Sequence, residues 1–205
     1  TGIANLWIKK DGKIYKNDMR IWAFDLDKQP FDDRDLYLDY DPIFSIFPFT
    51  QVIAGRGCPY QCTYCFNDAY RKIYQAEGST KYCNYRSPDN VIEELKILKN
   101  KYKAKFIFFN DSTLTYDKKW LLEFLPKYAS EIGLPMTINA VITEMNEEIA
   151  KALKDTGIYT LIRWGLETGN EEFRIKTLNK RFTNEQMSAG VELMQKYNLN
   201  YELND

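Results

Sequence analysis

The chain has 205 residues, of which 44% are hydrophobic and 15% aromatic, enough apolar side chains for one globular domain with a small appendage. Its 28 basic and 29 acidic residues give a net charge of −1, which argues against a broad basic surface for nucleic acid or anionic membrane. The absence of histidine excludes histidine-based catalytic triads, histidine-ligated haem and most catalytic zinc sites within these residues.

The first fifty residues are predicted to form a hairpin and a connector ahead of the main domain. Asp11-Gly12 lies between two apolar runs within residues 6–15, which is a strong signal for a two-stranded hairpin. Residues 23–49 are rich in aspartate, aromatic residues and proline. This composition is typical of a surface connector, and we prefer that interpretation to a metal-binding one. We therefore expect residues 1–50 to precede a core domain at residues 51–205.

From residue 51 onward the pattern strand, loop, helix repeats, which predicts a parallel sheet with covering helices. Pro126 should kink or interrupt the second of these helices. Right-handed crossovers would curl the strands into part of a (β/α) barrel, so the predicted fold class is α/β. The expected strands are residues 52–54, 106–109, 136–142, 159–166 and 199–203, and the expected helices begin at or just after Ser87, Asp117, Asn146, Glu171 and Thr183.

Three of the four cysteines, Cys58, Cys62 and Cys65, form a CxxxCxxC run just after the first expected strand. Thiolates bind soft metals, and three on one tight loop can hold three irons of a cubane cluster while the fourth iron stays open. A structural zinc site would need a fourth close ligand, but the remaining soft ligand is the distant Cys83, which we expect to be a packing residue. A disulfide framework is unnecessary in a chain that can build a core. The motif therefore favours an iron-sulfur cluster.

The run Gly55 to Phe66, with the aromatic Tyr64 directly before the third cysteine, resembles the hallmark of the radical S-adenosylmethionine (SAM) superfamily. The resemblance implies a [4Fe–4S] cluster held by the three cysteines, whose open iron is chelated by the amino and carboxylate groups of SAM. It further implies reductive cleavage of SAM to a 5′-deoxyadenosyl radical. Tyr64 and Phe66, which flank the third cysteine, are expected to line the cofactor site.

Polar residues near the ends of the expected strands are the candidate SAM contacts. In (β/α) folds the carboxyl ends of the strands form the active site, and the cysteine loop lies at such an end. Carboxylates, amides and one arginine suit the charged and polar groups of SAM. The alternative for each is a polar residue that caps a helix, faces solvent or, for Arg163, pairs with Glu167 or Asp111. The predicted SAM contacts are Asn110, Asp111, Ser112, Asn139, Arg163 and Glu167.

Further stretches resemble the branch of this superfamily that carries a cobalamin-binding domain ahead of the barrel. Residues 3–31, 86–95 and 165–169 look like that branch's connector, first helix and SAM-contacting strand, and the last implies that Glu167 binds the SAM ribose. Residues 109–112 look like its second strand end, except that Asn110 stands where an acidic residue is common. The resemblance implies a cobalamin bound by a domain outside this chain.

We therefore expect the N-terminal part of the catalytic barrel of a cobalamin-dependent radical SAM enzyme. Enzymes of this kind are most often methyltransferases that act on an unactivated carbon. We expect no catalytic residue beyond the cofactor site. The alternatives are a radical rearrangement, cyclisation or oxidation without methyl transfer, and an iron-sulfur protein used for electron transfer. The expected partners are a small-molecule or lipid substrate and a reductant such as ferredoxin or flavodoxin.

The remaining expectations concern the setting of the chain. No apolar run is long enough to span a membrane, and the cysteines read as free, which favours a cytoplasmic protein. The start at Thr1 and the end after a strand-like segment suggest a piece of a longer protein. Such a fragment could lack activity or the cluster when isolated.

Overall fold

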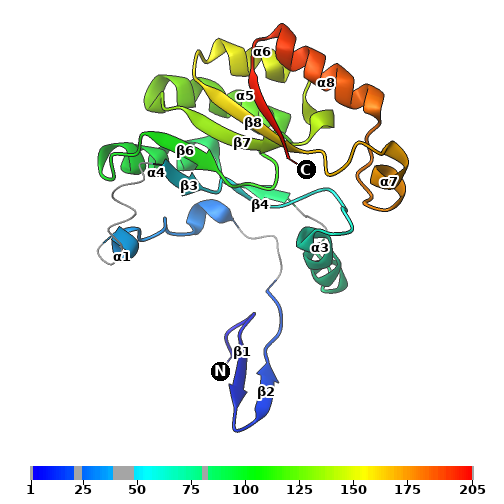
Figure 1. The fold of residues 1–205 in the computed structure, drawn as a ribbon. Coiled ribbons are helices and arrows are strands. Elements are labelled where there is room, and N and C mark those ends of the chain that lie inside the picture. The colour runs from blue at the N-terminus through cyan, green and yellow to red at the C-terminus, as the bar shows by residue number, and fades with distance from the viewer. Residues whose placement is uncertain (1, 21–24, 39–48, 80–82, 205) are drawn as a thin grey trace.

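The computed structural model describes residues 2–20, 25–38, 49–79 and 83–204 (Figure 1). Its main feature is a fully parallel sheet with the strand order β3-β6-β7-β8-β9. Among the described residues, β3 and β9 each pair with one strand of this sheet, so the sheet is open. The predicted α/β class and partial barrel are confirmed. The strands are β3 (Phe49–Val52), β6 (Phe106–Phe109), β7 (Met136–Ala140), β8 (Thr160–Gly165) and β9 (Asn200–Asn204).

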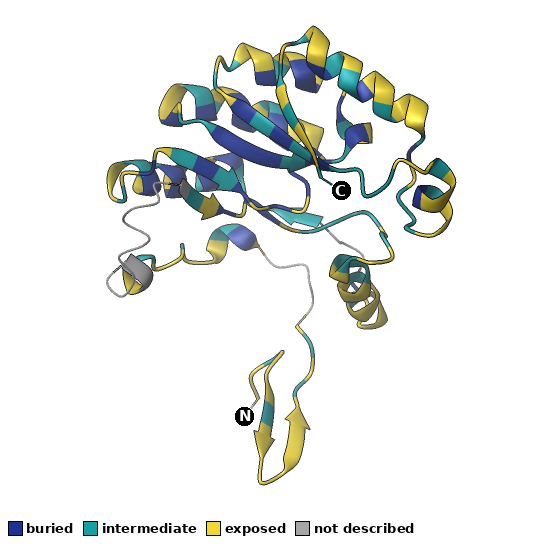
Figure 2. Ribbon diagram, in the orientation of Figure 1, coloured by how far each residue is buried: buried dark blue, intermediate teal, exposed yellow. Residues whose placement is uncertain are grey.

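Helices between the strands form a layer on one face of the sheet. In this layer α4 contacts α5, α5 contacts α6, and α6 contacts α8. Most of the buried side chains lie between these helices and the strands (Figure 2). The apolar faces therefore bury as amphipathic patterns predict, with residues such as Leu95 and Phe124 fully enclosed. The helices of the layer are α4 (Pro88–Asn100), α5 (Lys118–Lys127), α6 (Glu147–Asp155) and α8 (Asn184–Lys196), whereas α7 (Glu171–Lys176) lies to the side of the layer (Figure 1).

Strand β8 shows how the two faces of the sheet differ. Ile162 and Trp164 are buried toward the helices, whereas Arg163 and Gly165 on the opposite face are only partly buried. This second face is the one that would line a barrel interior. Its carboxyl-terminal edge is where the polar candidates lie.

The predicted hairpin is confirmed. Strands β1 (Trp7–Lys10) and β2 (Lys13–Lys16) pair in antiparallel register. Asp11 and Gly12 have φ values of 50° and 74°, so both adopt the left-handed conformation that a two-residue hairpin turn requires. None of the strand residues is buried, and the hairpin extends away from the sheet (Figure 1).

The described parts of the connector are held against α4 by its aspartates. The short helix η1 (Leu26–Lys28) buries Leu26, and the Asp27 carboxylate accepts a hydrogen bond from the Ser87 backbone N–H at 2.8 Å. In α1 (Asp35–Leu38), the Asp35 carboxylate pairs with Lys101 at 2.5 Å. Residues 39–48 of the predicted connector lie outside the described residues.

Three elements around the cysteines were not predicted. The first strand ends at Val52, and the chain then forms β4 (Gly55–Gly57), which pairs antiparallel with β5 (Cys83–Tyr85). Helix α3 (Phe66–Ala76) begins directly after Cys65. The cysteine loop is thus bounded by a short strand and a helix.

The segment around Pro126 differs from a simple break. Helix α5 runs through Pro126 to Lys127 and passes into the π-helical turn η2 (Tyr128–Ile132). The predicted interruption is therefore a change of hydrogen-bonding pattern after the proline, which lacks an N–H. Gly133, with φ 67°, ends the turn. A second short turn, η3 (Ile142–Glu144), follows β7, which ends at Ala140 and not at Ile142 as expected.

None of the helices in the described part of the chain has the length and hydrophobicity that a membrane span requires.

Candidate functional site

The cysteine loop lies beyond the carboxyl end of β3, between β4 and α3. Cys58, Cys62 and Cys65 are all partly buried free thiols. The Cys65 backbone N–H donates to the Cys62 carbonyl at 3.1 Å, and Cys65 occupies the N-cap position of α3. The three thiols are therefore carried by one folded turn.

Three thiols on one turn provide the kind of donor set that a [4Fe–4S] cluster uses. Across the described ranges, no three cysteine, aspartate or glutamate residues converge closely enough to ligate one ion. Each iron of a [4Fe–4S] cluster takes one cysteine thiolate, so a loop that carries three cysteines leaves one iron without a protein ligand. The donor set is thus suited to a cubane with one iron left open.

Burial disfavours the thiolate form of the first two cysteines of the loop. Burial raises the pKa of Cys58 to about 11. Burial also raises the pKa of Cys62, while the nearby Lys180 ammonium acts in the opposite direction. Because a metal ligand must be a thiolate, loading this loop has to release protons.

A segment more than a hundred residues away in the sequence fixes one side of the loop. The Thr63 backbone N–H donates to the Leu178 carbonyl at 3.1 Å, and the Thr63 hydroxyl donates to the Thr177 carbonyl at 2.8 Å. Asn179 Nδ2 donates to the Gln61 carbonyl at 2.7 Å. The chain after α7 therefore supports the middle of the CxxxCxxC run.

Two further side chains, neither of them predicted, contact the loop. The Tyr60 hydroxyl donates to Glu144 Oε1 at 2.8 Å, and Glu144 lies in η3 after β7. Asn67 Nδ2 lies 3.6 Å from Cys65 Sγ and donates to Ser112 Oγ at 3.0 Å. Ser112, a predicted site residue, is thus linked to the third cysteine through Asn67.

Asp111 is the most buried of the predicted site residues. Its two carboxylate oxygens accept hydrogen bonds from the backbone N–H groups of Ala54 at 3.0 Å and Gly55 at 2.6 Å. Burial raises the pKa of Asp111 to about 6, although these hydrogen bonds oppose the shift. The carboxylate fixes the link between β3 and β4, and the predicted SAM contact stays a prediction.

The two asparagines at this edge differ in accessibility. Asn139 Nδ2 donates to the Asp111 carbonyl at 2.8 Å, so its side chain joins β7 to the segment after β6. Asn110 is exposed, and its backbone N–H donates to the Val52 carbonyl at 2.8 Å. Both lie at the predicted edge, and their SAM contacts stay predictions.

Glu167 follows β8 in a constrained conformation. Its φ of 65° is unusual for a residue other than glycine, and such strain is often found at functional sites. Lys180 Nζ donates to Glu167 Oε1 at 2.9 Å and to the Gly165 carbonyl at 2.6 Å. A side chain at Gly165 would collide with both groups, so the glycine permits this close approach.

The aromatic residues flanking Cys65 lie at the surface of the site. Tyr64 and Phe66 are 53% and 67% exposed, so their rings are accessible to a bound molecule. Desolvation of the hydroxyl, followed by its hydrogen bond to Glu167, raises the pKa of Tyr64. Tyr64 and Glu167 therefore lie together, as a shared cofactor site would require.

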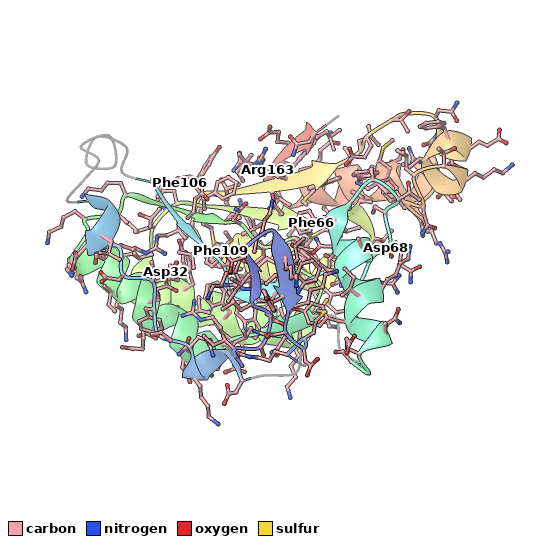
Figure 3. The ribbon with its side chains drawn as sticks, turned by 90° about the horizontal axis from the view of Figure 1, so that it is seen from below. Asp32, Phe66, Asp68, Phe106, Phe109 and Arg163 are labelled. Carbon is pink, nitrogen blue, oxygen red and sulfur yellow. The ribbon has the colours of Figure 1, made fainter. Side chains whose placement is uncertain are left out.

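Arg163 has a different partner from those considered. Its Nε lies 3.4 Å from Glu202 Oε2 on the neighbouring strand β9, and its guanidinium lies 5.5 Å from the centre of the Phe108 ring. The suggested pairing with Glu167 or Asp111 is wrong, because Glu167 binds Lys180 and Asp111 binds backbone N–H groups. Figure 3 labels Arg163 on β8 and Phe66 at the start of α3.

Cys83 lies closer to the motif than its position in the sequence suggests. It is the register partner of Gly57, the residue before Cys58. Burial raises the pKa of Cys83 to about 12, and the neighbouring Cys58 contributes in the same direction. Cys83 is partly buried, as a packing residue would be, and it also lies next to Cys58, the first cysteine of the loop.

Known sequences resemble most of this chain. Residues 52–203 match the family model described as the radical SAM superfamily. The chain is 28% identical over 201 residues to the uncharacterized methyltransferase PH0819 of Pyrococcus horikoshii, a match that covers 97% of this chain and 41% of that protein. It is 22% identical over 144 residues to the anaerobic magnesium-protoporphyrin IX monomethyl ester cyclase of Rubrivivax gelatinosus, covering 69% and 24%. The chain thus spans less than half the length of these relatives.

Solved structures share the fold. The radical SAM methyltransferase TsrM of Kitasatospora setae, solved with tryptophan substrate and a SAM analogue, superposes with a TM-score of 0.69 at 14% identity, covering 98% of this chain and 40% of that one. The structure of TsrM with cobalamin and a [4Fe-4S] cluster bound superposes with a TM-score of 0.68. The enzyme anSMEcpe with bound AdoMet gives 0.55 at 18% identity, covering 76% of this chain and 44% of that one.

Proposed function

Because this chain belongs to the radical SAM superfamily, whose cofactors are a [4Fe–4S] cluster and SAM, we propose that Cys58, Cys62 and Cys65 hold that cluster. When bound, the cluster supplies the electron that cleaves SAM to methionine and a 5′-deoxyadenosyl radical. The observation that carries the proposal is the single loop of three partly buried thiols at the carboxyl edge of the parallel sheet. In this proposal residues 51–205 are the core domain, preceded by the hairpin and connector of residues 1–50.

The residues of this chain bind and orient SAM beside the loop. Glu167, held by Lys180, offers a carboxylate that can accept hydrogen bonds from the ribose hydroxyl groups. Tyr64 shapes the space between Glu167 and the loop, and the accessible ring of Phe66 borders it. The other proposed contacts at this edge are Asn110, Asp111, Ser112, Asn139 and Arg163.

We further propose that the full protein transfers a methyl group to an unactivated carbon with the help of cobalamin bound by a domain outside this chain. The methyltransferase relative of Pyrococcus horikoshii supports methyl transfer, and the shared fold with cobalamin-bound TsrM supports the cofactor. The proposed partners are a ferredoxin or flavodoxin reductant and a small-molecule or lipid substrate in the cytoplasm.

A second candidate is a radical cyclisation or oxidation without methyl transfer, which the similarity to the Rubrivivax gelatinosus cyclase favours. Incubation of the full protein with methyl-labelled SAM and a reductant separates the two reactions. Methyl transfer by a radical route consumes two SAM molecules and yields both S-adenosylhomocysteine and 5′-deoxyadenosine. A reaction without methyl transfer yields 5′-deoxyadenosine and no S-adenosylhomocysteine.

The cluster itself is tested by electron paramagnetic resonance (EPR) of the anaerobically reconstituted, dithionite-reduced chain. We expect a four-iron signal that shifts when SAM is added, because SAM would bind the open iron. Cys58→Ala should lose the signal, whereas Cys83→Ala, which changes a cysteine beside the motif, should retain it. A signal indifferent to SAM would instead favour an electron-transfer protein, and loss of the cluster in Cys83→Ala alone would contradict the assignment of ligands.

A further inference from the structure

One carboxylate beside the cysteine loop receives an unusual number of hydrogen bonds. Tyr60 donates to Oε1 of Glu144 at 2.8 Å, and the hydroxyl groups of Thr113 and Thr115 both donate to Oε2. The Val141 backbone N–H lies 3.3 Å from the same Oε2. We call these five residues the Glu144 cluster.

The cluster joins three segments that are far apart in the sequence. Tyr60 belongs to the cysteine loop, Thr113 and Thr115 follow β6, and Val141 and Glu144 follow β7. The two threonines are 2% and 1% exposed, so their hydroxyl groups are fixed inside the protein. Glu144 therefore links the carboxyl edge of the sheet to the cysteine loop through hydrogen bonds.

The donors around Glu144 orient the carboxylate without neutralising it. Among the described residues, no lysine or arginine forms an ion pair with Glu144. A partly buried carboxylate is stabilised by such hydroxyl and N–H donors, and their fixed directions define where its oxygens point. The Tyr60 hydroxyl is thereby directed to a single acceptor position.

Tyr60 lies midway between the first two cysteines of the loop. The other half of the loop has its own supports, namely the N-cap position of Cys65, Asn67 and the contacts of Thr63. The backbone between Cys58 and Cys62 is supported by Tyr60 and by the Asn179 contact to Gln61. Loss of the Tyr60 hydrogen bond should therefore loosen this half first.

We propose that Glu144 is a positioning residue that acts through Tyr60 to hold Cys58 and Cys62 in the geometry required for cluster binding. The proposal rests on the proposed function, since it assigns the loop to a cluster. Thr113 and Thr115 hold Glu144 in turn. A role confined to general stability would affect all parts of the domain alike, whereas positioning affects the first two cysteines selectively.

The first test uses the protein without a cluster, so it does not depend on the proposed function. The rate of iodoacetamide alkylation is measured at each cysteine by peptide mass spectrometry under native conditions. In Tyr60→Phe, we expect alkylation of Cys58 and Cys62 to become several-fold faster while Cys65 changes little. The matched control is Tyr159→Phe, which alters an exposed tyrosine before β8 and should leave all rates unchanged.

The second test follows cluster binding. Glu144→Ala and Tyr60→Phe should weaken retention of iron and alter the EPR signal, with a loss in the range of about 10-fold to 100-fold that is usual for residues supporting metal ligands. Glu144→Gln keeps an oxygen for the Tyr60 hydrogen bond but places an NH2 group opposite the Val141 N–H, so it should restore part of the retention lost in Glu144→Ala. If Glu144→Ala fails to fold, Tyr60→Phe carries the comparison.

The outcomes separate this proposal from the assignment of the cluster. A wild-type protein that binds no cluster would refute the proposed function while the alkylation rates still report on the loop. Unchanged rates at Cys58 and Cys62 in Tyr60→Phe, or equal acceleration at all cysteines including Cys83, would overturn the positioning role.

Discussion

Asp111 shows how a single carboxylate determines the path of the chain into the cysteine loop. Its oxygens bind the consecutive backbone N–H groups of Ala54 and Gly55, where the chain leaves the parallel sheet and enters β4. Without an acceptor, these buried donors would each cost about 1–3 kcal/mol. The side chain therefore stabilises the path of the chain from β3 into β4.

The raised pKa of Asp111 predicts a specific dependence of stability on pH. A folded-state pKa of about 6 lies above the usual value of 3.8, so the folded protein binds a proton more tightly than the unfolded chain. The contribution of this group to the free energy of unfolding should therefore decrease by roughly 2 kcal/mol as the pH rises from the unfolded-state pKa to the folded-state pKa. In Asp111→Asn this contribution is absent.

Urea unfolding at several pH values between about 4 and 7 checks this prediction, with stability extrapolated to zero denaturant. As pH rises, the free energy of unfolding of the wild type should fall relative to that of Asp111→Asn. Asp18→Asn, at an exposed position of the hairpin segment, is the control. A difference that stays constant across the range would show that Asp111 does not titrate as proposed.

At the residue scale, the sequence yields a prediction where the residues that carry the chemistry are close together in the chain. The spacing of Cys58, Cys62 and Cys65 within eight positions was sufficient to suggest a cluster. The contacts of Tyr60 with Glu144 and of Lys180 with Glu167 have no such signal, because 84 residues separate the first pair and Lys180 comes after the intervening helix α7. Glu144 could have been suspected from its place after a predicted strand, whereas Lys180 could not.

At the scale of elements, the segment between α7 and α8 is organised by Arg174. This arginine is fully buried, and its guanidinium donates to the Phe182 and Thr168 carbonyls and to Asn184 Oδ1. It also lies 4.6 Å from the centre of the Phe182 ring. The segment between α7 and α8 carries the residues that bind the cysteine loop and Glu167.

We expect Arg174→Met to destabilise the protein by on the order of 3 kcal/mol, because it leaves buried carbonyl groups without donors. Chemical denaturation monitored by circular dichroism measures this change. Arg20→Met, at an exposed position, should have an effect within about 0.5 kcal/mol. A loss from Arg174→Met as small as that of the control would mean that water or other side chains replace the guanidinium.

The elements that prediction missed are those with weak local signals. Strand β4 is only Gly55–Gly57, and its partner β5 is equally short, so neither gives a period-two pattern. Helix α3 contains no buried residue, although Phe66, Tyr70 and Ile73 recur at helical spacing and could have indicated it. The helices with N-caps were found because Ser87, Asp117, Asn146 and Thr183 each accept a backbone hydrogen bond as expected.

At the scale of the whole molecule, the open sheet leaves β9 with one neighbour among the described residues. The outer edge of such a strand presents backbone N–H and C=O groups to any further strand. Leu203 on β9 is 41% exposed, so this edge strand also offers one accessible apolar side chain. We expect the 205-residue chain to self-associate through this edge as its concentration increases.

Sedimentation velocity over a range of concentrations tests the association. Leu203→Lys should lower the fraction of dimer, because a charged side chain on an edge strand disfavours pairing with another edge. Leu36→Lys, at an exposed position on α1, should leave the fraction unchanged. Equal dimer fractions in the two variants would place the contact elsewhere.

The supports of the cysteine loop also determine when, during synthesis, the loop can become ordered. Thr63 and Thr177 are 114 residues apart, and Asn179 is 118 residues beyond Gln61. A ribosome adding roughly 5–20 residues per second would therefore need about 6 to 24 seconds to produce these partners after the cysteines are synthesised. Until then the three thiols belong to an unsupported nascent segment, so delivery of iron and sulfur to a folded loop must follow translation of α7.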